Sequence, residues 1–472
     1  MYNTMMETVL IVGAGPSGLA LAQIAASQGA QVTVLDRETE IGGAHRVRRV
    51  EHQGQYFFSE HSARLYSSTY LNFRMLLQRV NLDFFDFFVP YKFQLTTIGK
   101  LNVQSLSLRE LMWFAWSVVR LIGNQDYGLR VSLQEFMQQH QFTAKAQDYL
   151  DRLARLTDGA GADRYSLNQF LQLINQYSFY RLYQPNQPND IGLLPAWQTK
   201  LQEAGVVFQV QKTAVSIDST TRTVTCADGS HFSADRIVLA IPPPDLVNLW
   251  SNGGDLREWA DKTKYIDYLS FVLIWDEPLE LPAVYGFPAS DWGVAFIVLS
   301  DYFKNDGRGT LMSTVISFPD AVSTRLGKTP HQCTRREIGI EIWNQLRKVF
   351  PPDKFPMPTY IVPSPGDYFD AQTQKWTTRD VAYIRSAAEP RPLAFSSPTF
   401  PWLFNVGTHN GQSPLRLTTL ESAVSNAVVL GHRLWPASKK TFPLTSPFTL
   451  TTLLVAALIL FSVLVILLVQ VL

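Results

Sequence analysis

Apolar residues along the chain fall into patterns that predict alternating strands and helices. Residues 9–12 form a short apolar run typical of a buried parallel strand, and 19–26 have the small and apolar side chains of a packed helix. The stretch "QVTVLD" at 31–36 predicts a second strand. Between 193 and 243 the pattern predicts a helix, a strand, a hairpin with the turn "ADGS" and a buried strand stopped by prolines. A short apolar strand, a glycine-containing loop and a helix follow at 402–434.

Two longer segments separate these blocks. The first contains "LSLRELMWFAWSVVRLIG" at 106–123, an apolar and aromatic helix that could lie on a membrane surface, although we expect it in the core of a helical subdomain. The second contains "YLSFVLIW", "GVAFIVLS" and "TLMSTVISF", runs rich in β-branched and aromatic residues. These runs predict a sheet that forms the floor of a substrate pocket.

The end of the chain has a different pattern. After Lys440 no charged residue or histidine appears, and 448–472 is long enough as a helix, about 37 Å, to cross a hydrocarbon core of about 30 Å. The alternative is a buried core helix, but such helices rarely have so uniform an apolar surface. We therefore expect a single-pass C-terminal membrane anchor. Lys439 and Lys440 just before it favour the cytoplasm for the rest of the chain.

Composition narrows the class of protein. A length of 472 residues with 46% hydrophobic content predicts a folded chain of more than one domain. A formal net charge of +1 without a basic run argues against nucleic acid as a partner. Cys226 and Cys333 stand alone, and the eight histidines have no metal-ligand spacing, so we expect no disulfide framework and no metal.

The first predicted strand leads into Gly13-x-Gly15-x-x-Gly18, the dinucleotide fingerprint. Its glycines allow a tight turn, close approach of a pyrophosphate, and packing of helix on strand. Pro16 and Ser17 lie at the start of the predicted helix, whose free N–H groups favour phosphate. Asp36, 18 residues after Gly18, stands where a carboxylate accepts from ribose hydroxyls and repels a 2′-phosphate, and Arg37 follows it. This segment alone leaves NAD and FAD open.

The next glycines bear on that choice. Gly42 and Gly43 follow the ribose-binding acid, which resembles the extended FAD fingerprint with a second glycine pair and a basic residue. That pattern usually has arginine directly after the pair. This chain has Ala44 there, so Arg46 or His45 would supply the basic contact.

The three strand–helix blocks together resemble the flavin amine oxidase and carotenoid (phytoene) desaturase superfamily of FAD-dependent oxidoreductases. The resemblance implies FAD as cofactor, an adenine contact at Val215, pyrophosphate or ribityl contacts at Gly407 and Thr408, and a flavin contact at Leu420 and Glu421. It also implies an α/β fold in which a Rossmann-type FAD-binding domain is interleaved with an α+β substrate domain. We expect the FAD-binding domain at 1–75, 190–245 and 400–435, the substrate domain at 76–189 and 246–399, a linker at 436–447 and the transmembrane anchor at 448–472.

The chain also departs from the amine oxidase pattern. Alignment of "YLSFVLIWDEP" places Ser270 where the family has a lysine that holds a water at the flavin. Thr419 replaces an aromatic residue of the amine cage, and no cysteine near the last motif could form a covalent flavin link. The chain therefore departs from a standard amine oxidase, and these departures favour an apolar substrate that is not an amine.

Four residues are candidates for catalysis. Glu60, His61 and Arg64 lie in a stretch that the family brings past the isoalloxazine, and His409 lies in the flavin-proximal loop. Histidine can move protons near neutral pH, and arginine could hold a substrate carboxylate or phosphate. Alternatively, Glu60 and Arg64 form a structural pair while His61 hydrogen-bonds the backbone.

These features predict a membrane-anchored FAD oxidoreductase that removes hydride from a lipophilic or amine-type small molecule. Oxygen or a quinone could accept the electrons. A redox-neutral flavin isomerase of the UDP-galactopyranose mutase type is the first alternative, because those enzymes share the opening motif and the glycine pair. A non-catalytic FAD-binding membrane protein is the second.

Overall fold

The structure is a computed structural model of the 472-residue chain. It describes residues 6–52, 54–61, 64–92, 104–179, 181–250, 254–266, 268–281, 290–303, 309–380, 382–384, 387, 392–396, 399–447 and 461.

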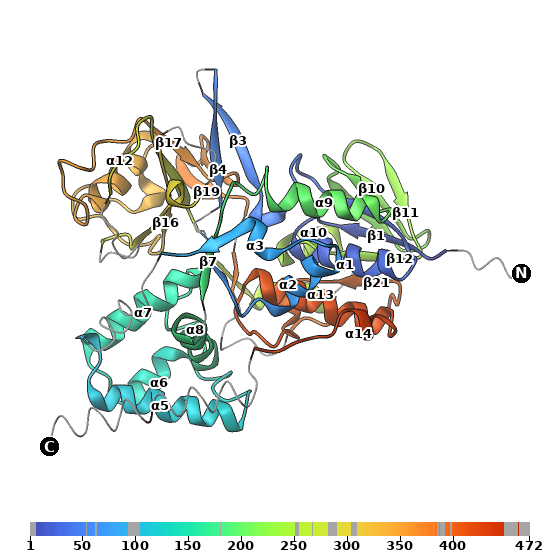
Figure 1. Ribbon diagram of the computed structural model, residues 1–472, viewed down its shortest axis with the longest axis horizontal. Helices are drawn as coiled ribbons and strands as arrows, with labels where there is room; N and C mark the ends of the chain where they lie inside the picture. The colour runs from blue at the N-terminus through green and yellow to red at the C-terminus, as the bar shows by residue number, and fades with distance from the viewer. Residues whose placement is uncertain are drawn as a thin grey trace, which may run out of the picture.

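A parallel five-stranded sheet organises one half of the molecule (Figure 1). Its order is β21-β12-β1-β2-β8, with β1 at Thr8–Val12, β2 at Gln31–Leu35, β8 at Val207–Gln209, β12 at Arg236–Leu239 and β21 at Leu403–Asn405. β1 pairs with β2 on one side and β12 on the other, and all four pairings are parallel. The predicted strands from three distant parts of the chain therefore join one sheet.

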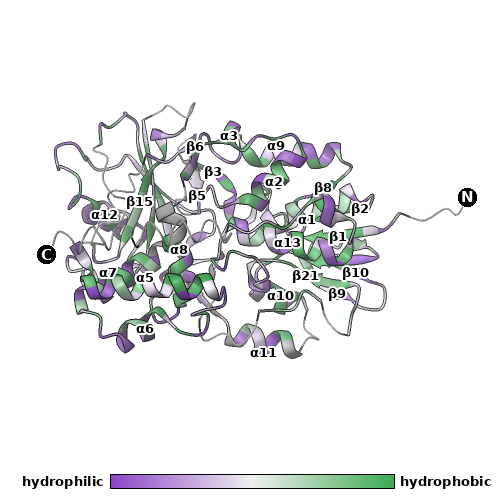
Figure 2. Cartoon of the chain, turned by 60° about the horizontal axis from the view of Figure 1, so that its bottom comes forward, coloured by the Kyte–Doolittle hydropathy of each residue, from purple (hydrophilic) through white to green (hydrophobic). Residues whose placement is uncertain are grey.

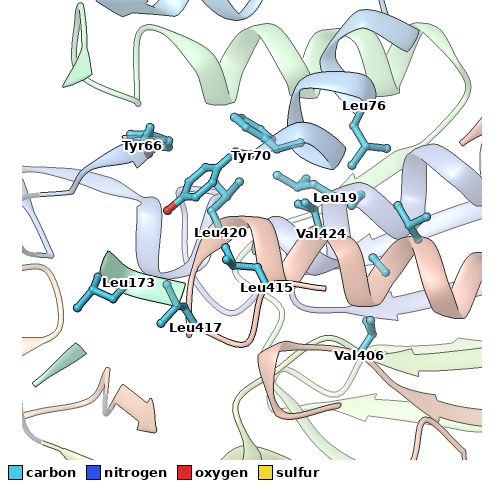
Figure 3. Packing of buried hydrophobic residues seen from close by; sticks show 14 of the residues in the cluster. Leu19, Tyr66, Tyr70, Leu76, Leu173, Val406, Leu415, Leu417, Leu420 and Val424 are labelled. Carbon is cyan, nitrogen blue, oxygen red and sulfur yellow. The ribbon is translucent and has the colours of Figure 1, made fainter. Parts of the chain in front are cut away.

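Helix α1 (Pro16–Ser27) packs on one face of this sheet, α13 (Leu420–Leu434) packs against α1, and α2 (Leu71–Arg79) packs against α13. Leu19, Leu76 and Val424 bring their apolar side chains together between them (Figure 3). Glu421, predicted to meet the flavin through its backbone, turns its side chain to the start of α2. There its carboxylate accepts from the N–H of Asn72 (2.9 Å) and of Phe73 (3.0 Å).

The other face packs against a second apolar cluster that includes Leu10, Ile237 and Val224. Val224 belongs to a three-stranded antiparallel sheet of order β11-β10-β9, in which the predicted hairpin is β10–β11. These strands are β9 (Ala214–Asp218), β10 (Thr223–Cys226) and β11 (His231–Ser233). Helix α10 (Pro243–Leu249) packs against β9, whereas α9 (Leu193–Glu203) packs against α1.

The second half of the molecule is built on an antiparallel sheet of order β15-β16-β14-β17. Its strands are β14 (Ser270–Trp275), β15 (Val294–Val298), β16 (Thr310–Ile316) and β17 (Tyr360–Pro363), and α12 (Arg335–Leu346) packs on it. The three β-branched and aromatic runs thus form the predicted sheet. The smaller elements here are α11 (Gly254–Lys262), β13 (Lys264–Ile266), β18 (Asp367–Asp370), β19 (Lys375–Thr378) and β20 (Ala382–Ile384).

Helices α5 (Leu108–Gly123), α6 (Leu133–Gln139), α7 (Ala144–Asp158) and α8 (Leu167–Phe179) form a separate helical group (Figure 1). α5 begins at a capping box between Ser107 and Glu110. One face of α5 is buried, as expected of a helix in the core of a helical subdomain. Its outer face exposes an apolar stripe, and the cartoon coloured by hydropathy shows both polar and apolar residues along the helix (Figure 2). The stripe consists of Leu108, Met112, Trp116 and Val119.

Short elements connect the two halves. They are β3 (Val47–His52), β4 (Gln55–Glu60), β5 (Tyr66–Ser67), α3 (Phe84–Phe87), β6 (Phe88–Pro90) and β7 (Leu182–Pro185). β3 and β4 form an antiparallel pair in which Glu60 is the last residue of β4, opposite Val47. β4 packs against β14 and β17, so the chain passes from the parallel sheet to the antiparallel one at Glu60.

The predicted anchor, 448–472, lies outside the described residues except for Phe461. Within the described part of the chain, no helix combines the length and the apolar character needed to cross a bilayer. The preceding linker is packed rather than extended. α14 (Ser438–Thr441) leads to the buried Phe442, and the Asn72 side chain makes two hydrogen bonds with the backbone of Thr445, at 2.8 and 2.9 Å.

Candidate cofactor and active site

A cavity of about 620 Å³ lies where the glycine-rich turn after β1, the end of β2, strand β9 and the start of α13 meet. Its volume is within the range of small-molecule sites. Most of the residues predicted for the site line it, although they come from distant parts of the sequence. They are Gly13, Gly15, Pro16, Ser17, Asp36, Arg37, Gly43, Arg46, His61, Arg64, Val215, Gly407, Thr408, His409 and Leu420.

Gly18, Gly42 and Glu60 lie outside the lining. Gly18 is required by packing, because a Cβ there would lie 1.9 Å from the carbonyl oxygen of Gly13. Gly42 has a left-handed φ of 115° and packs against Leu194, where a Cβ would lie 2.4 Å from a methyl carbon. The Glu60 side chain is buried and is not part of the lining.

The turn after β1 has the geometry that a dinucleotide requires. Gly13 has a φ of 108°, and a Cβ there would lie 2.4 Å from the carbonyl oxygen of Ala240. Gly15 caps α1, and no side chain accepts from the first N–H groups of the helix. Gly15, Pro16 and Ser17 line the cavity, so this helix end presents free N–H donors to an anionic group. The residues present therefore fit a pyrophosphate.

Asp36 follows β2 and is held by the backbone. Its two carboxylate oxygens accept from the N–H of Ala14 (2.7 Å) and of Glu38 (2.9 Å). Burial raises the pKa of Asp36, and these two hydrogen bonds act against that rise. The carboxylate thus has a fixed orientation toward the cavity, as ribose recognition requires.

Beside Asp36 lies a group of paired charges that we call the acid–arginine cluster: Arg37, Glu38, Arg46, Asp245 and Asp380. Arg37 pairs with Asp245 at 3.1 Å, and Arg46 pairs with Asp380 at 2.7 Å while also donating to the carbonyl of Gly43. Sequence reasoning missed both aspartates. Asp380 is 334 residues from Arg46, and no local pattern marks it.

His45, the other basic candidate after the glycine pair, faces a different neighbour. Its Nδ1 lies 3.0 Å from the Tyr66 hydroxyl, and burial lowers its pKa well below the usual value. His45 is therefore neutral near pH 7, and Arg46 is the charged residue of this loop.

His61, Arg64 and Tyr268 form a second part of the lining, which we call the His61–Arg64 wall. The rings of His61 and Tyr268 have centroids 6.3 Å apart. Arg64 donates to the carbonyl of Ala44, and its own carbonyl accepts from Gln184 at 2.7 Å. Tyr268 was missed, although it lies two residues before Ser270, on the same face of an extended chain.

The alternative roles for these residues were an ion pair between Glu60 and Arg64 and a hydrogen bond from His61 to the backbone. Neither contact occurs among the described residues. No ion pair joins Glu60 to Arg64, and Nδ1 of His61 has no hydrogen-bond partner. The buried Oε1 of Glu60 also has none. Burial raises the pKa of Glu60 to about 7 and lowers that of His61 to about 4. His61 is consequently neutral near pH 7, and Glu60 is partly protonated.

The remaining predicted positions are His409, Thr419 and Ser270, and they differ in their relation to the cavity. Burial lowers the pKa of His409 to about 3, and its Nε2 lies 3.1 Å from the Asn405 side-chain oxygen, so the ring is neutral and oriented. Thr419 lines the cavity. Ser270 is buried in β14 outside the lining and donates to the carbonyl of Thr314 at 2.8 Å.

Comparison with known proteins adds the following. A family model described as flavin containing amine oxidoreductase matches residues 16–409. A putrescine oxidase variant has 15% identity over 92% of this chain and 99% of its own, with a TM-score of 0.66. An oxidoreductase from Methanosarcina mazei has 15% identity over 90% and 99%, with a TM-score of 0.61. A CLA-producing fatty acid isomerase from P. acnes has 13% identity over 91% and 99%, with a TM-score of 0.59. These identities show a shared fold alone. A search of curated protein sequences found no match.

Proposed function

Since this chain belongs to the flavin-containing amine oxidoreductases and is an FAD-dependent oxidoreductase, we propose that it oxidises a lipophilic small molecule at a membrane surface. FAD, when bound, would supply the chemistry that accepts hydride from a carbon–hydrogen bond. The α1 N-terminus and the turn at Gly13 and Gly15 would hold its pyrophosphate, and Asp36 would accept from its ribose hydroxyls. Backbone at Val215 and at Gly407 and Thr408 would hold the remaining parts of the nucleotide.

The residues of the chain that would face the substrate orient it, accept hydrogen bonds and exclude water. His61 and His409 are neutral near pH 7, so they orient and accept hydrogen bonds rather than supply positive charge. Tyr268 and Leu420 provide apolar surface that excludes water from the reacting carbon. Ser270 lies outside the cavity lining, so no residue at the family's lysine position holds a water there.

The observation that carries this proposal is the convergence of the three sequence blocks on one cavity. Among its described residues, Ser270 at the family's lysine position lies outside the lining, and Thr419 stands where the family has a cage aromatic. Anaerobic mixing of the purified holoprotein with lipophilic candidates and with amines tests it. We expect loss of the flavin's visible absorbance with a lipophilic substrate. Reduction by amines alone would contradict the proposed substrate class.

A redox-neutral isomerase is the second candidate. It is favoured by the structural likeness to a CLA-producing fatty acid isomerase and by the glycine pair at Gly42 and Gly43. The same mixing experiment separates the two. An isomerase would leave the oxidised flavin unchanged, or would turn over only after dithionite reduction, whereas an oxidase would be reduced by its substrate.

We further propose that the chain is held at a membrane by 448–472, with the catalytic part on the cytoplasmic side. Two features support this: the uncharged apolar sequence after Lys440, and the exposed stripe on α5, where Met112 is 54% and Trp116 53% exposed. Flotation with lipid vesicles tests it by comparing the full chain with a chain ending at Pro447. The shorter chain should lose stable binding, and substitution of Met112 and Trp116 by glutamine should weaken what remains. Equal flotation of the full and shortened chains would contradict the anchor.

A further inference from the structure

The arginines that line the cavity are not alike in their partners. Arg37 and Arg46 each form an ion pair with an aspartate, at 3.1 and 2.7 Å. Arg64 forms no ion pair with any described residue, and the one acceptor it reaches is the carbonyl of Ala44. A guanidinium in a protein cavity without a carboxylate is costly unless a ligand supplies the anion.

Glu60, in the strand before Arg64, forms no ion pair with this charge. It is buried outside the cavity lining, and burial raises its pKa to about 7 although the positive charge of Arg64 acts against that rise. The other acids of the cavity are already engaged. Asp36 accepts from backbone N–H groups, while Asp245 and Asp380 pair with Arg37 and Arg46. The His61–Arg64 wall therefore has one positive charge, because His61 is neutral near pH 7.

The positive charge of Arg64 affects which substrates the cavity can bind. A protonated amine would be repelled by Arg64 and would find no ionised acid on the wall. Thr419 stands where the family has a cage aromatic, so cation–π attraction is also missing at that position. Tyr268 and Leu420 next to the charge are suited instead to an apolar chain.

We propose that Arg64 binds the carboxylate of an apolar carboxylic acid, which makes the substrate of the proposed oxidoreductase an acid rather than an amine. A single guanidinium matches one carboxylate through two parallel N–H donors. Gln184 supports this role, because it fixes the backbone carbonyl of Arg64 at 2.7 Å. The inference rests on the proposed function only in taking the cavity as the substrate site.

Binding to the purified, FAD-loaded full chain tests this without turnover. The probes are dodecanoate, dodecylamine, dodecanol and dodecyl phosphate, titrated anaerobically and followed by the flavin's visible difference spectrum. We expect dodecanoate to bind at least about tenfold more tightly than the amine and the alcohol, since a charged hydrogen bond is worth about that much. Tighter binding of the amine or of the phosphate would overturn the proposal.

Variants assign the effect to Arg64. Arg64→Gln should weaken dodecanoate about 10- to 100-fold and leave dodecanol within about twofold, whereas Arg64→Lys should retain part of the preference. Arg335→Gln, on the exposed start of α12, is the matched control and should change neither. FAD content shows that each variant is folded. Unchanged dodecanoate affinity in Arg64→Gln, with or without a shifted flavin potential, would show that Arg64 serves the flavin or the fold instead. Failure of every probe to reduce the flavin would count against the oxidase alone, because the binding preference is measured separately.

Discussion

The acid–arginine cluster and the His61–Arg64 wall line the same cavity, but their arginines differ in their partners. In the cluster, Arg37 and Arg46 meet carboxylates of the chain itself. On the wall, Arg64 meets a backbone carbonyl, and Glu60 outside the lining is partly protonated near pH 7. A cluster in which each arginine has a carboxylate partner fixes the geometry of the loop after the glycine pair. A wall that leaves one charge unmatched is adapted to a ligand with the opposite charge.

The largest effect is expected at the turn that holds both regions in place. Gly13→Ala would bring a Cβ to 2.4 Å from the Ala240 carbonyl at a φ of 108°, so we expect a loss of about 3–5 kcal/mol in unfolding free energy and loss of bound FAD. Gly29→Ala is the control, because its φ is 83° but nothing lies within 4 Å; we expect about 1 kcal/mol. Urea unfolding and the flavin-to-protein absorbance ratio measure both. Equal losses would show that contact with Ala240 is unimportant.

The second largest loss of stability is expected from substitution of Asp380, the partner of Arg46. Asp380→Asn would leave a guanidinium whose side chain is 6% exposed facing Glu38 at 3.9 Å. We expect a loss of about 2–4 kcal/mol in unfolding free energy, because a buried charge would lose its closer partner and keep only the more distant carboxylate of Glu38. Denaturant unfolding of the variant measures it. A loss below about 1 kcal/mol would mean that Arg46 does not depend on Asp380 for its charge partner and would remove the contrast with the wall.

The third prediction concerns Glu60 next to the wall and the dependence of protein stability on pH. The folded pKa of Glu60 is raised to about 7 from 4.5, so the folded state binds its proton more tightly than the unfolded state. Its contribution to stability is therefore lost as pH rises from about 4.5 to about 7. Glu60→Gln lacks this loss and should be more stable than the parent by about 2–3 kcal/mol at pH 8, with little difference at pH 4.5.

Unfolding of both proteins across this pH range measures the difference. A constant gap between them at every pH would show that Glu60 is ionised throughout and that Arg64 has an acid partner after all.

The smallest effect is expected at the exposed side of the cluster. Arg37 and Asp245 have side chains 39% and 37% exposed, so solvent screens their pair. Arg37→Gln should cost less than about 1 kcal/mol in unfolding free energy. A loss as large as that of Asp380→Asn would show that the cluster acts as one unit, and additivity in the double variant would confirm that it does not.

Local motifs explain why one part of the site could be predicted. Gly13, Gly15 and Asp36 lie within one strand–turn–helix–strand unit, where spacing along the chain fixes spacing in the fold. The central sheet was predictable for the same reason, because each of its blocks has a strand and a helix with a clear period.

The rest depends on contacts between distant segments. Nothing near Arg46 indicates that Asp380 completes its pair, since 334 residues separate them. The burial of Glu60 outside the lining accompanies the packing of β4 against β14, which no local pattern indicates. Tyr268 lies two residues before β14 and lines the cavity, whereas Ser270, the position marked by the family pattern, is buried in β14 outside the lining.

The FAD content of the purified full chain, compared between the parent, Gly13→Ala and Arg64→Gln, tests the central claim most directly. If one cavity holds FAD with the cluster at its nucleotide and the wall at its substrate, the parent and Arg64→Gln contain one FAD per chain and Gly13→Ala contains almost none. A parent protein that is colourless and takes up no added FAD would contradict the account. So would a Gly13→Ala variant that retains its flavin in full.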